Sequence, residues 1–501
     1  MSKSPTLRPR VYDTGSGDAP PPYFTTPSAP EMPLPDPTER FDRRDGVPMP
    51  QRITAILAVS FGSALVVIDG AIPTVALPRI ATDLHVDSSA VVSIITIYQL
   101  VLVMVLLPFS GLGERIGLKR MYQIGQTIFA IATLLCFFAK SLPFLLIVRV
   151  AQALGAGAAL SVSSALVRSI YPSNQLGRGL ALNSVVVSSG AAIAPTLGGL
   201  VLGVAPWPWV FASAVPFAIF SLLFGRALPD PKMRPEPFDL LGAVMCAGMF
   251  GLIIGGLESA VHGDSPVVSA AIVAAGVFLA VLIVRKQRAE AAPILPIDLL
   301  RSPVIGLSVI GGFLAFIASM TLILSMSFRL QHAYGFAPSE AGAAIGVWPL
   351  TMMIVAPLSG YLSDRYPAGL LGGIGMVIAV AALLFIAFLP VQPDYWDVAW
   401  RMSLAGMGFG MYMSPNARFI IGSAPRSRMA PAGGLVSTTR LVGQTTGATA
   451  VAALLALGIG GGEVPALVAA GLAVVAGLCS VGRLRPAIRN PARATAIEDA
   501  G

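Results

Sequence analysis

Long apolar segments separated by short polar loops run along this chain from residue 53 to residue 482. Hydrophobic residues make up 55% of the 501-residue sequence, and only 12% of residues are charged, about half the share found in soluble proteins. A helix of about 20 apolar residues is long enough to cross a bilayer. We therefore predict an all-α polytopic membrane protein whose fourteen spans lie at 53–77, 90–110, 121–139, 142–166, 179–203, 209–226, 240–258, 266–284, 303–328, 341–362, 369–389, 398–418, 431–457 and 464–482.

Positive charges gather on alternate loops of this topology. On the predicted cytoplasmic side there are 27 Lys and Arg residues, against four on the opposite side. Such an excess marks the cytoplasmic loops of membrane proteins. We therefore expect an even number of spans, both termini in the cytoplasm and a multi-pass location, in a bacterial inner membrane. The formal net charge of +8 follows from these loops and does not indicate a nucleic-acid partner.

Two similar turns, SGLGERIGLKR at 110–120 and GYLSDRYPAG at 360–369, follow the second and the tenth predicted spans. Internal repetition of this kind is typical of secondary transporters. Because the repeat is displaced by eight spans, we predict two six-helix bundles with two helices inserted between them. The predicted parts are a Pro-rich, disordered cytoplasmic tail at 1–52, a bundle at 53–226, the inserted pair with linkers at 227–302, a bundle at 303–482 and a cytoplasmic tail at 483–501.

Five motifs occur in order along the predicted spans, namely IDGAIPTVALP (68–78), SGLGERIGLKR (110–120), RVAQALGAG (149–157), GAAIAPTLGG (190–199) and STTRLVGQTTGA (437–448). Together they resemble the signatures of the major facilitator superfamily. The first and the last are similar to those of its drug:proton antiporters with fourteen helices. The resemblance covers nearly all of the hydrophobic part of the chain.

The resemblance implies a proton-coupled antiporter that exports small amphipathic or cationic compounds from the cytoplasm by alternating access. Two alternatives stay open: an exporter of an endogenous metabolite such as a siderophore or an amino-acid derivative, and a membrane-embedded sensor that does not transport. Because no GxSxG, HExxH or nucleotide-binding loop occurs in its expected setting, we expect neither an enzyme nor an ATP-driven pump.

The expected partners are a small-molecule substrate, protons and the lipid bilayer. We expect a monomer, which an envelope adaptor protein can join. The three cysteines and three histidines are scattered, so we expect no metal site and no cofactor.

Ionisable residues inside the spans are the first candidates for function, because a charge within the membrane is costly. Asp69 lies about 25 Å from the cytoplasmic end of the first span, and Arg149 lies at a similar depth in the fourth. We predict that the two interact and that protonation of Asp69 releases Arg149. A static ion pair that fixes helix packing is the alternative. Glu258, at the outer end of the seventh span, is expected to be a solvated group rather than a coupling acid.

Four further residues are expected to line a substrate cavity. Arg440 lies in the middle of the thirteenth span, where a structural role is an equally good interpretation. Gln152 and Gln444 lie three and four residues from the two intramembrane arginines, on the same helical faces. Met411 belongs to a group of methionines in the twelfth span, whose flexible side chains suit varied ligands.

The repeated turns are expected to form a cytoplasmic gate. The gate residues are Glu114, Arg115, Lys119, Asp364 and Arg365. The acids lie near helix termini, where they interact with the helix dipole, and the cations can reach carboxylates of the other half.

Small residues and a proline mark the fifth span. By resemblance to the antiporter motif, Gly190, Pro195, Gly198 and Gly199 are expected to form a seal against leak, although tight helix packing alone would require the same residues.

Overall fold

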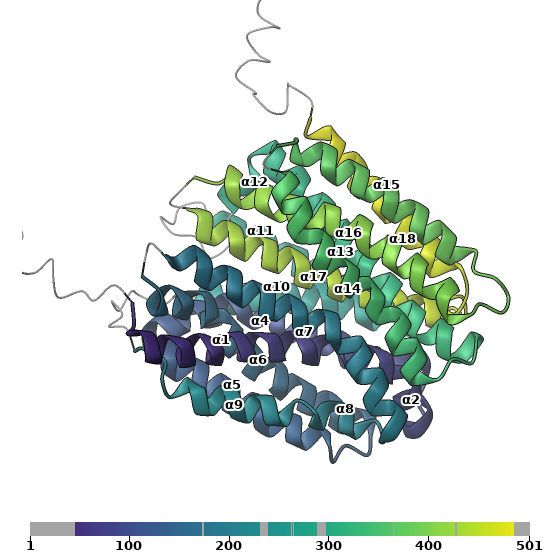
Figure 1. Ribbon diagram of the computed structural model, residues 1–501, viewed down its shortest axis with the longest axis horizontal. Coiled ribbons are helices and arrows are strands. Elements are labelled where there is room, and N and C mark those ends of the chain that lie inside the picture. Colours follow the sequence, from purple (N-terminus) through teal and green to yellow (C-terminus); the bar gives the residue numbers. More distant parts are fainter. Residues whose placement is uncertain are drawn as a thin grey trace, which may run out of the picture. The chain divides into compact units, whose positions relative to one another are not determined.

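The computed structural model describes residues 46–172, 175–230, 239–261, 263, 265–287, 297–363, 365–425 and 428–484. Within these residues every regular element is a helix, in agreement with the predicted all-α class (Figure 1). Most of the two predicted tails, together with Asp364, lie outside the described residues.

Three of the six spans predicted in the N-terminal bundle are built from two consecutive helices. The first consists of α1 (Met49–Ala71) and α2 (Pro73–Leu84), and Pro73 fits this boundary because the fixed φ of proline suits the first position of a helix. The other two pairs are α3 (Ser88–Val91) with α4 (Ser93–Ile116), and α8 (Pro208–Ala212) with α9 (Val215–Gly225). The three spans formed by a single helix are α5 (Leu118–Cys136), α6 (Leu142–Ile170) and α7 (Leu176–Val204).

The remaining helices also follow the predicted spans. Residues 303–328 form one continuous helix, α13 (Pro303–Phe328), which continues as the short π-helix η2 (Arg329–Ala333). The others are α10 (Leu240–Val261), α11 (Pro266–Gln287), α12 (Ile297–Leu300), α14 (Pro338–Leu362), α15 (Ala368–Ala387), α16 (Tyr395–Ser423), α17 (Met429–Ala456) and α18 (Val464–Gly482).

All fourteen predicted spans therefore fall on helices. Ten helices among the described residues are long and apolar enough to cross a membrane. The other four predicted spans lie on α5, α7, α16 and α17. Of these, α5, α16 and α17 carry more polar and small residues, and Ser189–Val204 of α7 is a shorter apolar segment. The count of fourteen stays a prediction.

Helix packing explains how residues distant in the sequence meet. In the first half α6 packs against α1, α4 and α5, and in the second half α16 packs against α14 and α15. The two halves touch through α7 with α14 and through α4 with α17. The pair α10 and α11 packs together, and α10 also packs against both α4 and α17 (Figure 1). The inserted pair thus contacts a helix of each half, although the predicted domain boundaries stay predictions.

Candidate functional site

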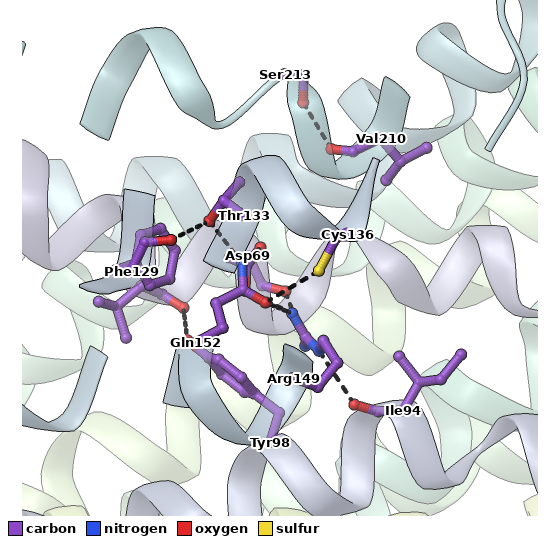
Figure 2. A network of polar contacts seen from close by, with 11 residues as sticks. Asp69, Ile94, Tyr98, Phe129, Thr133, Cys136, Arg149, Gln152, Val210 and Ser213 are labelled. Atoms are coloured by element: carbon purple, nitrogen blue, oxygen red, sulfur yellow. Dashed lines mark hydrogen bonds and ion pairs between the residues drawn. The ribbon is translucent and has the colours of Figure 1, made fainter. Parts of the chain in front are cut away.

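A buried ion pair joins α1 to α6 in the first half of the chain. The Arg149 Nη1 atom lies 2.6 Å from Asp69 Oδ2, and both side chains are completely buried (Figure 2). Arg149 Nη2 also donates to the Asp69 backbone carbonyl at 3.5 Å. The structure therefore brings together the two residues that the sequence predicts to interact.

Gln152 completes this network. Its Oε1 accepts a hydrogen bond from Arg149 Nη1 at 2.7 Å, while its Nε2 donates to Asp69 Oδ1 at 2.9 Å and to Thr133 Oγ1 at 2.8 Å. Thr133 in turn donates to the Phe129 carbonyl at 2.7 Å. We predicted Gln152 as a cavity residue, but its side chain is completely buried here because its amide bridges the ion pair and α5.

Close helix packing makes the α5 contact possible. A Cβ atom on Gly155 would lie 2.6 Å from the Gly125 carbonyl oxygen, so these helices approach at a distance that only glycine permits. The approach brings Thr133 on α5 within hydrogen-bonding reach of Gln152 on α6.

The remaining surroundings of Arg149 are a carbonyl and two aromatic rings. Its Nε donates to the Ile94 carbonyl at 3.3 Å, and its guanidinium carbon lies 4.1 Å from the Tyr98 ring centre and 5.5 Å from that of Phe211. Sequence reasoning missed Tyr98, since nothing in the sequence indicates that α4 also faces Arg149.

This network can respond to a proton. With Asp69 ionised, the guanidinium and the carboxylate neutralise each other inside the protein. Protonation of Asp69 removes that compensation and leaves Arg149 a buried cation bonded only to neutral groups, which is strongly unfavourable. A change of protonation here therefore changes the relative free energies of arrangements that hold or release Arg149.

The glycines of the predicted antiporter motif lie at two helix interfaces. Gly190 and Gly198 face α1, where a Cβ on Gly198 would lie 2.8 Å from the Ile72 carbonyl oxygen. Gly199 faces α14, where a Cβ would lie 3.0 Å from the Cα of Gly342.

The neighbouring proline also belongs to the α14 contact. A Cβ on Gly342 would lie 2.6 Å from the Pro195 carbonyl oxygen. The sequence did not indicate that Gly342 is the partner of this motif, because a lone glycine in a predicted span has no distinctive pattern.

The other predicted cavity residues lie on α17 and α16. Arg440, Gln444 and Met411 are all half-buried. Among the residues that the structure describes, no hydrogen bond or ion pair is made by Arg440. The structure does not bring these three residues to the Asp69 network.

The predicted gate residues of the first turn lie at the end of α4 and the start of α5. Glu114 and Arg115 are exposed, and Lys119 Nζ donates to the Arg226 carbonyl at 2.9 Å. Between the two helices Gly117 has a φ of 103°, which favours glycine.

In the second turn Arg365 is exposed and donates to the Tyr361 hydroxyl at 2.9 Å. Lys119 and Arg365 thus bond within their own halves in this conformation. Asp364 lies outside the described residues.

Two polar residues lie in surroundings that the sequence did not predict. Arg483, counted above with the C-terminal tail, is 5% exposed and donates to Ser308 Oγ, Asn416 Oδ1 and Ser480 Oγ at 2.7–2.9 Å. Glu258, expected to be solvated, is half-buried and accepts a hydrogen bond from the Thr449 hydroxyl at 2.8 Å. Both differences arise because neighbouring helices cover these positions.

Buried intramembrane charges and two helical halves that meet through α7–α14 and α4–α17 define a multi-span membrane transporter. The family model of the Major Facilitator Superfamily matches residues 59–448 and 308–499. The chain belongs to the major facilitator superfamily, which confirms the resemblance inferred from its motifs.

Curated relatives extend over most of the chain. An uncharacterized transporter of Escherichia coli, YebQ, is 41% identical over 440 residues, which are 87% of this chain and 96% of that protein. The riboflavin transporter RibZ of Clostridioides difficile is 27% identical over 78% of this chain and 86% of its own length. The methyl viologen resistance protein SmvA of Salmonella typhimurium is 28% identical over 74% and 76%.

Among solved structures, the fold is similar to that of a bacterial homolog of the human lysosomal transporter Spinster. The TM-score is 0.61 at 17% identity, over 87% of this chain and 98% of the other. At this identity the likeness shows the fold alone, and the fold is that of major facilitator transporters.

Proposed function

We propose that this protein is a proton-coupled antiporter that exports small amphipathic or cationic compounds from the cytoplasm by alternating access. The observation that carries the proposal is the completely buried network of Asp69, Arg149 and Gln152. In this network the Asp69 carboxylate, which can accept a proton, is the direct counter-ion of the Arg149 guanidinium, which cannot lose one.

The free energy of breaking the Asp69–Arg149 ion pair is similar to the free energy needed to shift a transporter between two conformations. Removing one partner of a buried ion pair costs about 3–5 kcal/mol. Moving a two-state equilibrium from 1:99 to 99:1 requires about 5.5 kcal/mol. Protonation of Asp69 therefore supplies much of the difference between a conformation that keeps the pair and one in which Arg149 finds other partners. The membrane potential adds about 2.3 kcal/mol per charge per 100 mV.

Contacts between the halves support alternating access. Gln331 Nε2 donates to the Val75 carbonyl at 2.9 Å, and the close approach of Gly199 to Gly342 lies near the same ends of the helices. Both contacts lie toward the ends that the charge pattern predicts to face outward. The described arrangement is therefore closed there, and the halves would have to separate at these contacts to open outward.

Drug-type cations are the favoured substrate class because relatives include a methyl viologen resistance protein. A second candidate is an exporter of a neutral metabolite with hydrogen-bond acceptors. The half-buried Arg440 offers donors for such a molecule, and a riboflavin transporter is also among the relatives.

Transport in everted vesicles tests both candidates. Energised vesicles with the wild-type protein should accumulate ethidium or methyl viologen, and a protonophore or Asp69→Asn should abolish this. Arg149→Lys, which keeps the charge but not the paired donors, should retain part of the activity. Accumulation of riboflavin without either cation would favour the second candidate. Proton-driven transport at the wild-type rate in Asp69→Asn would overturn the role of Asp69.

A further inference from the structure

A second carboxylate lies within the helices, away from Asp69. Glu258 is on α10, the first helix of the inserted pair, and lies 18 residues after the start of that helix at Leu240. This corresponds to about 27 Å along the helix. Glu258 is half-buried, and its Oε1 atom is shielded from solvent. Because an ionisable residue inside a membrane span is costly, such an acid is a candidate for function.

The partner of Glu258 on the second half is Thr449. Thr449 is 5% exposed, and its Oγ1 donates to Glu258 Oε2 at 2.8 Å. Three other threonines of α17 donate instead to the carbonyl four residues earlier, as is usual in helices: Thr439, Thr445 and Thr446. A hydroxyl has a single donor hydrogen, and Thr449 directs it to the carboxylate of another helix.

This geometry can hold either protonation state of the carboxyl group. When Glu258 is ionised, it is an acceptor only and receives the Thr449 hydrogen. When Glu258 is protonated, its own hydroxyl can donate to Thr449 Oγ1, and the threonine hydrogen is then free to turn to the carbonyl of Thr445, four residues earlier. A proton can thus bind without breaking the contact between Glu258 and Thr449.

The charged groups on the helices around Glu258 are few within the described residues. On the helices that pack against α10, they are Glu114 and Arg115 on α4, Arg285 and Lys286 on α11, and Arg440 on α17. The first four lie at the opposite, cytoplasmic ends of their helices. Arg440 precedes Thr449 by nine residues, about 13 Å along α17.

A further titratable side chain, Tyr98 on α4, donates its hydroxyl to the Val66 carbonyl and so faces α1. His262 follows Glu258 by four residues but lies outside the described residues.

We propose that Glu258 is a second proton-binding carboxyl group, held by Thr449 where the inserted helix α10 meets α17. Because α10 also packs against α4, proton binding at this contact acts where the two halves meet. The proton site stands on this geometry alone, whereas its use in transport rests on the proposed function. It would give the inserted pair a role in coupling.

Infrared titration of the purified full-length protein in lipid nanodiscs tests the site without any substrate. The band of protonated carboxyl groups should lose one titrating component in Glu258→Gln and keep that component in Asp69→Asn. Asp264→Asn, six positions after Glu258 in the sequence, is the matched control. An imidazole does not contribute to this band, so His262 cannot mimic the signal. A titration of Glu258→Gln identical to that of the wild type would overturn the proposal.

The threonine supplies an independent test if Glu258→Gln does not fold. Thr449→Val should raise the proton affinity of that component about fivefold, because the lost hydrogen bond to the ionised carboxylate is roughly twice as strong as the one to the neutral acid, whereas Thr449→Ser should leave it unchanged. An unchanged component in Thr449→Val would contradict the assignment. If vesicles with the wild-type protein transport none of the tested compounds, the proposed function fails. The infrared titration then still shows whether Glu258 binds a proton.

Discussion

The guanidinium carbon of Arg149 lies 4.1 Å from the centre of the Tyr98 ring, while the Tyr98 hydroxyl donates to the Val66 carbonyl at 3.2 Å. The ring thus covers one face of a buried cation whose fork is occupied by Asp69 and Gln152. An aromatic face stabilises a desolvated cation by about 2 kcal/mol. Tyr98 is therefore a supporting residue of the ion pair.

We expect Tyr98→Phe, which keeps the ring, to lose only the hydroxyl hydrogen bond, about 1 kcal/mol. Tyr98→Leu should lose roughly 2–3 kcal/mol, because both the ring face and the hydrogen bond are removed. Thermal unfolding in detergent, followed by tryptophan fluorescence, measures the order of the two variants. Equal melting temperatures for Tyr98→Phe and Tyr98→Leu would show that the ring face contributes nothing.

The contact between α7 and α14 predicts a second result. In Gly199→Ala the new Cβ would lie 2.7 Å from the Pro338 carbonyl oxygen, so the two helices must move apart. Overpacking of this kind costs about 1–3 kcal/mol. We expect a lower melting temperature and slower transport.

The matched control for this contact is Gly203→Ala, one turn further along the same helix. Its Cβ would lie 3.6 Å from the Ser339 Cβ, an ordinary contact, so the melting temperature should stay at the wild-type value. If Gly199→Ala behaves like Gly203→Ala, the interface is not as tight as described.

Arg483 predicts a third result. Its guanidinium joins α18 to α13 and α16 through Ser308, Asn416 and Ser480. Arg483→Met keeps the length of the side chain but leaves these polar groups without their donor, and we expect a loss of about 3 kcal/mol.

Arg365→Met is the corresponding control, because Arg365 is exposed and bonds only one neighbouring hydroxyl among the described contacts. It should change the free energy of unfolding by less than about 0.5 kcal/mol. Equal chemical-denaturation curves for Arg483→Met and Arg365→Met would contradict a structural role of Arg483.

A fourth prediction concerns pH and a pair outside the predicted spans. Arg428 Nη2 lies 2.6 Å from Asp298 Oδ1, and its hydrogen bonds lower the pKa of the Asp298 carboxyl below the ordinary value. Because the folded-state pKa is the lower one, the pair stabilises the fold above the unfolded pKa of about 3.9, and the stabilisation is lost as pH falls through the folded pKa.

Since both side chains of this pair are partly exposed, the contribution at pH 7 should be at most about 1 kcal/mol. Asp298→Asn should therefore melt slightly below the wild type at pH 7, and the gap should close in acid. Melting temperatures across a pH series in a low-salt detergent buffer measure this. A gap that widens as pH falls would show that the sign is wrong.

The positions of the helices could be read from the sequence because each depends mainly on its own segment. Transfer of an apolar stretch into a bilayer is favourable whatever its neighbours are, so all fourteen predicted segments fall on helices. The depths of Asp69 and Arg149 were accessible for the same reason, since position along a helix follows from residue number alone. The family followed from short motifs in the right order.

The partners of the polar side chains depended on tertiary packing. Gln152 shares a helical face with Arg149, but only the close approach of Gly125 to Gly155 turns that face toward Thr133. Thr449 reaches Glu258 across 191 positions of sequence, and α13 and α16 surround Arg483, which the sequence alone assigned to a tail. The sequence by itself therefore determined which segments are helical and where along them charges lie. Only the tertiary structure decided which charges meet, because helix rotation and crossing are set by contacts between segments far apart in the chain.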